Sequence, residues 1–435
     1  MKMVKKVFLF AVLVILVVAY TMLVGSPTYD EIWNYGYGYN IASGMIPYRD
    51  FNMLATPLWL YLVALSIKIL GNYLLSMHIL NAIVIVGMFF LLHNMLGKKS
   101  LIIFPLILIG STPTYNVFST FLFILFIYLK STDFSCKKSS IIFGLIVSML
   151  FLTKQTLGMM LFIVEFFYSK NKKIYFASFI LPILLFCFYF VMNGAFYQFI
   201  DYSFLGMLDF GSRNSNVSIY LFLEIFICIF VIYLYKRYKY SELLYVLSFQ
   251  IVVAPIFDIY HFVLGVRMIV LVLLLKFDYM GFKTKYFVIW TLVLFILDSI
   301  VGLQDGVSIK NNYLFGRNIG NNAIVVIDET SNYINDYDND YDKIYIVSGM
   351  AYMIRLYMDD CIDRYDMILN GNMGYKGYLD YIEGIDDYCN SNRCLFLVES
   401  YLGVGYDQTN HEIIDYVYNN YYKVDEFYIF DVYSN

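Results

Sequence analysis

Apolar runs, many of them long enough to cross a lipid bilayer, recur from Val7 to Gln304 of this sequence. A membrane-spanning helix needs about 20 mostly apolar residues. The chain is 60% hydrophobic and 15% charged, whereas soluble domains average ~45–50% apolar and ~25% charged residues. We therefore predict a polytopic α-helical membrane protein.

Charge is divided unequally between the two ends of the chain. Residues 305–435 carry 22 acidic and 8 basic residues, whereas residues 1–304 carry a net charge of +10. We predict a transmembrane domain over 1–304 and a water-soluble domain over 305–435. Neither part has the basic face that nucleic-acid binding requires, so we expect no nucleic-acid partner.

The first apolar run follows Lys2, Lys5 and Lys6, as in a signal peptide, but no small-residue cleavage site follows it. We expect a retained first helix. The apolar pattern predicts eleven spans, at approximately 7–24, 74–96, 100–112, 116–130, 139–153, 156–169, 174–192, 218–235, 241–256, 259–275 and 286–304.

The positions of the basic residues test this threading. With a cytoplasmic N-terminus, 17 of the 22 basic residues before position 305 fall at cytoplasmic ends or loops, as the positive-inside rule requires. The segment Thr56–Leu70 must then be a helix on the outer surface, not a span. An odd number of spans places the acidic tail outside, so we expect a multi-pass plasma-membrane protein with an extracytoplasmic C-terminal domain.

The tail alternates strand-like and helical patterns, which predicts a small α/β domain. The expected strands are Lys343–Ser348, Met367–Leu369, Cys394–Glu399 and Phe427–Val432, and the expected helices are Ala351–Met358, Gly377–Tyr388 and Glu412–Tyr421. The tail has three cysteines. Cys389 and Cys394 form a disulfide or, with Cys361, stay free thiols; the sequence leaves both states open.

Several polar residues gather on the predicted outer face. Asp30 and Glu31 follow the first span, and Lys154 and Gln155 lie in a very short loop. An ordinary loop with a helix N-cap and a lysine reaching the interface would also explain these residues. Asp258 and His261 are followed by Arg267, which lies within a span. Such an arginine usually faces a cavity, a partner or a pathway, although a structural ion pair with Asp258 or Glu224 is the alternative.

Taken in order and sidedness, these motifs resemble the C-type, polyprenyl-phosphate-dependent glycosyltransferases, in the branch of the protein O-mannosyltransferases and the aminoarabinose transferase of lipid A (glycosyltransferase family 39-like). The resemblance covers the membrane part and rests on short motifs: Asp30-Glu31, Gly44-x-x-Pro47-Tyr48-Arg49-Asp50-Phe51, Thr56-Pro57-Leu58, Lys154-Gln155 and Asp258-x-x-His261. One departure concerns the outer loop after the predicted span at 100–112, where such enzymes often carry a second acidic residue. Here the loop reads Ser111 to Asn116 without a carboxylate.

The resemblance implies an inverting transfer of a hexosyl or pentosyl group from a polyprenyl-phosphate carrier to an acceptor at the outer face of the cell envelope. Asp30 would be the general base, with Glu31 steering it or binding the sugar. The donor phosphate would be bound by Lys154, Gln155, His261, Arg267 and Arg49, with Asp258 orienting His261.

Asp30 and Glu31 have the oxygen ligands that a divalent cation prefers, but adjacent residues rarely both face one ion. We therefore expect no obligatory metal or other cofactor. The expected partners are the lipid-linked donor, membrane lipids and an acceptor whose identity, whether glycan, lipid or protein, the residues do not specify.

Other functions remain open from sequence. A transporter or flippase would show polar or broken helices near mid-membrane and repeat symmetry, which we do not find. A polymerase or ligase of lipid-linked glycans would rely on arginines in a large late outer loop, where this chain places only Arg213. A sensor would need a cytoplasmic output domain, and the inner loops are too short to contain one.

Overall fold

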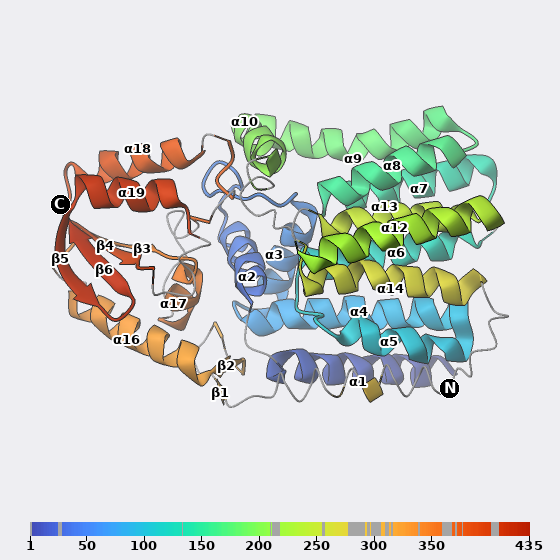
Figure 1. The fold of residues 1–435 in the computed structure, drawn as a ribbon, viewed down its shortest axis with the longest axis horizontal. Coiled ribbons are helices and arrows are strands. Elements are labelled where there is room, and N and C mark those ends of the chain that lie inside the picture. Colours follow the sequence, from blue (N-terminus) through green and yellow to red (C-terminus); the bar gives the residue numbers. More distant parts are fainter. Residues whose placement is uncertain are drawn as a thin grey trace.

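The computed structural model describes residues 2–24, 28–132, 134–208, 210, 218–254, 257–276, 292–293, 296, 306–308, 313–314, 316–337, 340–358, 368–369, 372–375, 377–401 and 409–435. These residues form a long helical bundle with a smaller α/β domain at one end (Figure 1). The N-terminus lies at the far end of the bundle and the C-terminus in the α/β domain. The membrane-type helices predicted from composition and a C-terminal sheet are both present.

The helical part contains α1 (Lys2–Leu23), α2 (Tyr29–Ala42), α3 (Leu58–Leu70), α4 (Leu74–Leu96), η1 (Gly97–Lys99), α5 (Ser100–Leu108), α6 (Tyr115–Lys130), α7 (Cys136–Phe151), α8 (Gln155–Tyr168), α9 (Lys172–Met192), α10 (Phe196–Ile200), the π-helix η2 (Asp201–Leu205), α12 (Ile219–Tyr238), α13 (Ser241–Phe249), η3 (Gln250–Val253) and α14 (Ile259–Lys276). The predicted span at 286–304 lies mostly outside the described residues, as does the proposed domain boundary at 304/305.

Length and composition qualify four described stretches as membrane spans: Leu74–Leu108, Lys172–Met192, Ile219–Tyr238 and Ile259–Lys276. Five further apolar helices are shorter, including Val7–Leu23 and Tyr115–Lys130. Exposed large apolar side chains cover α9 and α12, among them Phe188, Phe226 and Ile229. In a soluble protein such a surface would be an association hazard, whereas a bilayer covers it.

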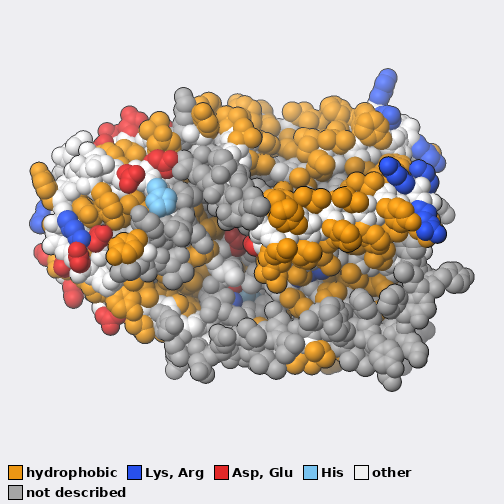
Figure 2. Space-filling model, viewed as in Figure 1, with side chains coloured by type: hydrophobic (Ala, Val, Ile, Leu, Met, Phe, Trp, Pro, Cys, Tyr) orange, Lys and Arg blue, Asp and Glu red, His pale blue; other side chains and the backbone are white. Residues whose placement is uncertain are grey.

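Basic side chains gather at the end of the bundle farthest from the α/β domain, and acidic ones are frequent on the α/β domain (Figure 2). The basic turns include Lys98 and Lys99 after α4, Lys130 at the end of α6, and Lys236 and Arg237 at the end of α12. Basic residues that the sequence predicted on one side of the membrane therefore lie together at one end of the folded bundle.

Between bundle and α/β domain lie α2 and α3, which pack on each other (Figure 1). Gly38 of α2 allows this packing, because a Cβ at that position would lie 2.3 Å from Val63 Cγ1 of α3. The predicted helix after Pro57 is present as α3. Most of the segment after Asp30 is helical as well, and its polar composition gave no apolar periodicity from which to predict this.

The C-terminal domain has a four-stranded sheet in the order β3-β4-β6-β5, with β3 (Lys343–Val347) and β4 (Cys394–Glu399) parallel and β5 (Tyr422–Phe427) and β6 (Phe430–Ser434) antiparallel. Helices α16 (Asn321–Tyr337) and α17 (Ala351–Tyr357) lie on one face, and α18 (Gly377–Cys389) and α19 (His411–Asn420) on the other (Figure 1). A short hairpin, β1 (Gly306–Ser308) and β2 (Asn318–Gly320), precedes them.

Helices on both faces explain why all six residues of β4 are buried. Its alternate side chains enter two different cores: Leu395 and Leu397 pack in one, and Phe396 and Val398 in the other. The strands predicted at Lys343 and Cys394 and the three predicted helices are therefore present to within two residues.

The predicted strand Phe427–Val432 is wrong in its bounds. The chain turns at Tyr428, whose φ is +53°, and β5 and β6 pair as a hairpin on either side of this turn. β5 is almost wholly exposed, so its alternation of polar and apolar residues does not mark a buried face. Of the predicted strand at Met367–Leu369, Leu369 forms an isolated bridge with Thr409, and Met367 lies outside the described residues.

Cys389 and Cys394 form a disulfide between the end of α18 and the start of β4. This resolves the choice left open by the sequence in favour of the bridge. Cys361 lies outside the described residues.

Candidate functional site

Asp30 and Glu31 occupy the first turn of α2, which Thr28 caps by accepting a hydrogen bond from the Glu31 N–H at 3.1 Å. Consecutive residues on a helix point about 100° apart, as 3.6 residues per turn dictates. The two carboxylates therefore have different surroundings. Glu31 is fully buried, whereas Asp30 retains partial exposure.

Asp30 interacts electrostatically with three charged or titratable groups from distant parts of the chain: Lys154, His261 and Asp258. The structure thus brings together four of the residues singled out in the sequence. Burial raises the pKa of Asp30, and His261 and Lys154 partly oppose this rise. A carboxylate with a raised pKa is a stronger base than an ordinary surface aspartate, as a general base at neutral pH requires.

Lys154 lies in the short connection between α7 and α8. Its Nζ donates a hydrogen bond to Asn116 Oδ1 at 2.8 Å and lies 5.6 Å from the centre of the Tyr115 ring. Burial lowers the pKa of Lys154 to about 8, although Asp30 and Asp258 oppose this shift. The ammonium is therefore held at the same end of the bundle as Asp30 by a neutral amide.

Asp258 and His261 form a local pair at the start of α14. Asp258 Oδ1 accepts a hydrogen bond from the His261 backbone N–H at 2.8 Å and lies 2.9 Å from His261 Nδ1. Burial would raise the pKa of Asp258, but these hydrogen bonds lower it below its usual value. The carboxylate is thus ionised near neutral pH and fixes the orientation of the imidazole.

Arg267, two turns farther along α14, is buried and donates a hydrogen bond to the Ile109 carbonyl. Gly110, which follows Ile109, has a φ of +59°. A Cβ at this position would lie 3.2 Å from the Tyr260 ring and 4.0 Å from an Arg267 nitrogen. A glycine is needed for this close approach. Arg267 therefore lies beside Tyr260, the neighbour of His261.

The other predicted phosphate ligands have different surroundings. Gln155 Nε2 donates to the Ser203 carbonyl at 2.8 Å and more weakly to that of Leu54 at 3.5 Å. Arg49 is exposed, binds the adjacent Asp50 at 2.7 Å and donates to the Asn193 carbonyl. No contact joins either residue to the Asp30 cluster among the described interactions. Arg213 lies outside the described residues.

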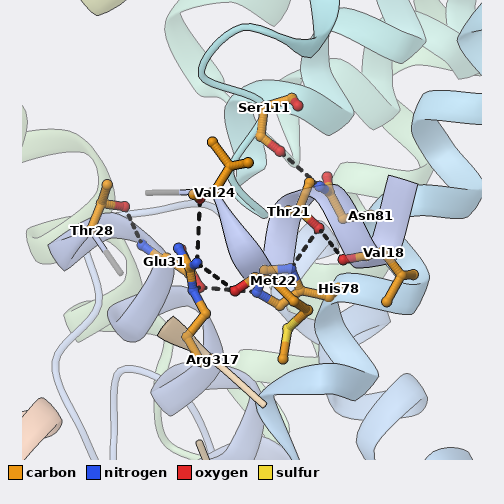
Figure 3. Close-up of polar contacts among 10 residues, drawn as sticks. All are labelled: Val18, Thr21, Met22, Val24, Thr28, Glu31, His78, Asn81, Ser111 and Arg317. Carbon is orange, nitrogen blue, oxygen red and sulfur yellow. Dashed lines mark hydrogen bonds and ion pairs between the residues drawn. The ribbon is translucent and has the colours of Figure 1, made fainter. Parts of the chain in front are cut away.

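Glu31 belongs to a second polar network, one that the sequence did not predict (Figure 3). Its Oε1 lies 3.0 Å from Arg317 Nε and 2.9 Å from His78 Nε2, and its Oε2 accepts from Arg317 Nη2 at 3.1 Å. Burial would raise the pKa of Glu31, but Arg317 and His78 outweigh it and lower the pKa to about 2. Both Glu31 oxygens are thus engaged, which favours the steering role over sugar binding.

Two residues of the Glu31 network went unnoticed in the sequence: His78 and Arg317. Asn116 drew attention only as part of a loop without a carboxylate. His78 is a polar residue in an apolar helix, a signal that could have identified it. Arg317 lies in a short segment with no periodic pattern, and no local signal distinguishes it.

Among the residues that the structure describes, no group of three His, Cys, Asp or Glu side chains is arranged to hold a metal ion. The carboxylate of Asp30 interacts instead with Lys154 and with the Asp258–His261 pair. This set suits an anion and its counter-charges better than a hard divalent cation, which prefers several oxygen ligands.

Comparison with known proteins finds no match among family models and none among curated sequences. Among solved structures, the chain is similar to ArnT from Cupriavidus metallidurans in a crystal structure bound to undecaprenyl phosphate. The TM-score is 0.58 and the identity 9%, over 99% of this chain and 98% of that one. The same protein in the apo state gives a TM-score of 0.56 at 9% identity, over 100% and 98%.

The similarity extends through both the bundle and the α/β domain, because nearly the whole of each chain is covered. The fold implied by the resemblance to C-type, polyprenyl-phosphate-dependent glycosyltransferases is therefore confirmed. At 9% identity the comparison bears on the fold alone.

Proposed function

We propose that this protein is an inverting glycosyltransferase that moves a sugar from a polyprenyl-phosphate carrier to an acceptor at the outer face of the membrane. The observation that carries the proposal is the electrostatic grouping of Asp30 with Lys154, His261 and Asp258 at the α/β-domain end of an apolar bundle. A carboxylate of raised pKa grouped with an ammonium is the pair that this reaction requires.

In the proposed reaction, an acceptor hydroxyl attacks the anomeric carbon of the sugar. A new C–O bond forms to the acceptor while the bond from that carbon to the carrier phosphate breaks. Asp30 accepts the hydroxyl proton, and the products are a glycoside and the polyprenyl phosphate. A single displacement by one base from the side opposite the phosphate inverts the anomeric configuration.

The leaving phosphate gains negative charge but needs no proton, so fixed positive groups are enough to stabilise it. Lys154 is our first choice for this role because its ammonium is held at the end of α7 and α8. His261, oriented by Asp258, is the second. Arg267 would add positive charge from about two turns deeper along α14, whereas Gln155 and Arg49 would act only if their present hydrogen bonds exchanged for the donor.

The similarity of fold to a protein crystallised with undecaprenyl phosphate supports a donor of this chemical class. The exposed apolar side chains of α9 and α12 supply a surface compatible with lipid tails. Which sugar is carried, and whether the acceptor is a glycan, a lipid or a protein, is left open by the proposal.

An extracytoplasmic site is part of the proposal. Basic turns at the opposite end of the bundle support it, because such turns face the cytoplasm in membrane proteins. The Cys389–Cys394 disulfide also supports it, since disulfides persist mainly in oxidising compartments. We further propose that no metal or other cofactor is obligatory, because Lys154 supplies positive charge and His261 a further polar contact where a cation would otherwise act.

Replacing Asp30 by Asn tests the base directly, because the amide keeps the shape but cannot accept the proton. Transfer from a labelled polyprenyl-phosphate sugar would be measured in membranes containing equal amounts of each variant. We expect a loss of about 10²–10⁴-fold, the range for removal of a general base. Asp415→Asn, at an exposed position of α19, is the matched control and should leave transfer unchanged.

Sidedness has its own test. Single cysteines at positions 30 and 154 should react with a membrane-impermeant thiol reagent, or be protected from it, from the same side of the bilayer. Labelling from opposite sides, or full activity of Asp30→Asn, would exclude the proposed site.

A further inference from the structure

Arg317 is a fully buried arginine in the short segment that leads from the bundle into the α/β domain. Its guanidinium forms two hydrogen bonds with Glu31, at 3.0 and 3.1 Å, and donates from Nη1 to the carbonyls of Met22 at 3.0 Å and Val24 at 3.4 Å. Figure 3 shows Arg317 reaching between Glu31 and the end of α1. One side chain therefore ties the start of α2 to the end of α1.

The network continues into the bundle on the other side of Glu31. His78 of α4 lies 2.9 Å from Glu31 through Nε2 and 2.8 Å from Thr21 Oγ1 through Nδ1. Both His78 and Glu31 have no exposed side-chain surface. A buried charged group is stable only when its partners are fixed, so these contacts define one position for the first turn of α2.

The segment carrying Arg317 follows α2 along its length. Near the end of α2, Tyr39 lies 3.3 Å, oxygen to oxygen, from Tyr313, and the Tyr313 carbonyl accepts from the Leu74 N–H at 2.7 Å. The α/β domain adds a further contact, since Asn372 Nδ2 donates to the Tyr37 hydroxyl at 2.9 Å. Residues C-terminal to the bundle thus hold α2 at its start and in its second half.

These contacts also restrain the position of Asp30, which immediately precedes Glu31 in the first turn of α2. The first turn of a helix lacks half of its backbone hydrogen bonds and frays unless side chains hold it. Arg317 supplies that restraint from outside the helix. Loss of the restraint would let Asp30 move relative to Lys154 and His261, which lie on other elements.

We propose that Arg317 is a positioning residue for the catalytic base: through Glu31 it fixes the turn of α2 that carries Asp30, and the segment entering the α/β domain is thereby a structural part of the active site. This inference rests on the proposed function. It assigns to Glu31 the role of transmitting the restraint, with no contact to the sugar.

Two variants separate positioning from folding. Arg317→Lys keeps the positive charge but cannot form the same planar set of hydrogen bonds. The double variant Glu31→Gln with Arg317→Gln removes both charges, so neither is left buried alone. Arg393→Gln, on the exposed surface of the α/β domain, is the matched control.

We expect all these variants to insert and fold, as judged by their thermal unfolding in detergent. For the Lys and double variants we expect the donor KM to stay within about twofold and kcat to fall by about a hundredfold, since a displacement of about 1 Å has that cost. The control should keep both constants.

The pH profile gives a second readout that a purely structural role would not change. Asp30 faces Lys154, His261 and Asp258, with Tyr37, Tyr115 and Tyr260 around it. If Asp30 moves away from Lys154 and His261, their lowering effect on its pKa weakens. The acid limb of kcat should then move to higher pH in the double variant.

Transfer by the wild-type protein tests the proposed function separately. With wild type active, a double variant that folds and retains wild-type kcat and an unshifted acid limb would overturn the inference while leaving Asp30 as the base. A fall in kcat with an unchanged donor KM and a shifted limb would support it.

Discussion

Lys154 Nζ donates a hydrogen bond to Asn116 Oδ1 at 2.8 Å, so a neutral amide is the direct partner of the ammonium. Asn116 lies in the first turn of α6, at the end of the segment predicted as an outer loop, where the family resembled by this sequence often has a carboxylate. A neutral partner offsets less of the cost of burying a charge than a carboxylate does. This explains why burial can lower the pKa of Lys154 to about 8.

Asn116→Asp should therefore raise the pKa of Lys154 and keep it protonated at higher pH. The alkaline limb of the activity profile should move upward by about one pH unit, in keeping with the effect of an adjacent opposite charge. Because Asp30 interacts with the same ammonium, a second carboxylate there should raise the pKa of Asp30 and move the acid limb upward as well. Rates of transfer across the acidic to alkaline range provide the measurement.

Asn116→Leu is the companion variant, because it removes the hydrogen bond without adding charge. It should move the alkaline limb of the activity profile to lower pH, or raise the KM for the donor. An unchanged profile in both variants would mean that Lys154 does not titrate in the active pH range.

The wild-type profile itself should be bell-shaped. Asp30 must be ionised to accept a proton, and burial raises its pKa, so activity should fall on acidification at a pH above the usual range of aspartate. Lys154 must be protonated to bind phosphate, and its pKa of about 8 predicts a loss of activity above that pH. The two limbs belong to the interacting pair, not to each residue alone.

Arg at position 154 would stay charged throughout this range, because a guanidinium does not lose its proton in proteins. Lys154→Arg should therefore abolish the alkaline limb while retaining part of the activity. Lys68→Arg, on the exposed side of α3, is the control and should keep the alkaline limb of the wild type. An alkaline limb that persists in Lys154→Arg would assign it to another group.

The sequence predicted the bundle well because apolar length and the alternation of basic turns are both local properties. Lys154, Asp258 and His261 were singled out for the same reason, since each lies beside an apolar helix on the predicted outer side. Their grouping with Asp30 in the structure follows from that sidedness. The approach of Asp258 to His261 follows from their spacing of three residues.

The second network could not be predicted in this way. Arg317 and Glu31 are separated by 286 residues, and their contact depends on how the segment before the α/β domain packs against the bundle. Asn372 contacts Tyr37 for the same kind of reason. The polar helix α2 was also missed, because Tyr, Asn and Gly at most of its positions hide the periodicity that marks an amphipathic helix.

Asp258→Asn should weaken activity without removing it. The amide can still accept the backbone N–H of His261, but it loses the charge that favours one orientation and tautomer of the ring. We expect kcat to fall about tenfold, equivalent to the ~1.5 kcal/mol that a hydrogen bond to a charged group contributes. His261→Gln removes the ring that Asp258 orients and should cost at least as much; wild-type activity of this variant would exclude His261 from donor binding.

Chelation should leave activity unchanged if no metal is obligatory. Membranes treated with excess EDTA and then assayed in metal-free buffer should transfer sugar at the untreated rate. Loss of transfer that returns on addition of Mg²⁺ or Mn²⁺ would contradict this expectation and would make Asp30 the first ligand to examine. The treated protein should first be shown to unfold at its usual temperature.

A buried charge far from the site should affect stability alone. Glu165 of α8 is buried, lies 2.7 Å from Lys130 Nζ and accepts a hydrogen bond from the Tyr245 hydroxyl at 2.7 Å. It is ten residues beyond Gln155, hence about 15 Å along the helix from the Asp30 end.

Glu165→Leu would leave Lys130 without its carboxylate. Because the Lys130 side chain is 21% exposed, we expect a loss of about 2 kcal/mol, less than the ~3–5 kcal/mol for breaking a fully buried pair. Glu165→Gln keeps the acceptor for Tyr245 and should lose less. Thermal unfolding in detergent should rank wild type above the Gln variant and the Gln above the Leu variant, while kcat per folded molecule stays constant. A fall in kcat at unchanged stability would show that this end of the bundle is coupled to the site.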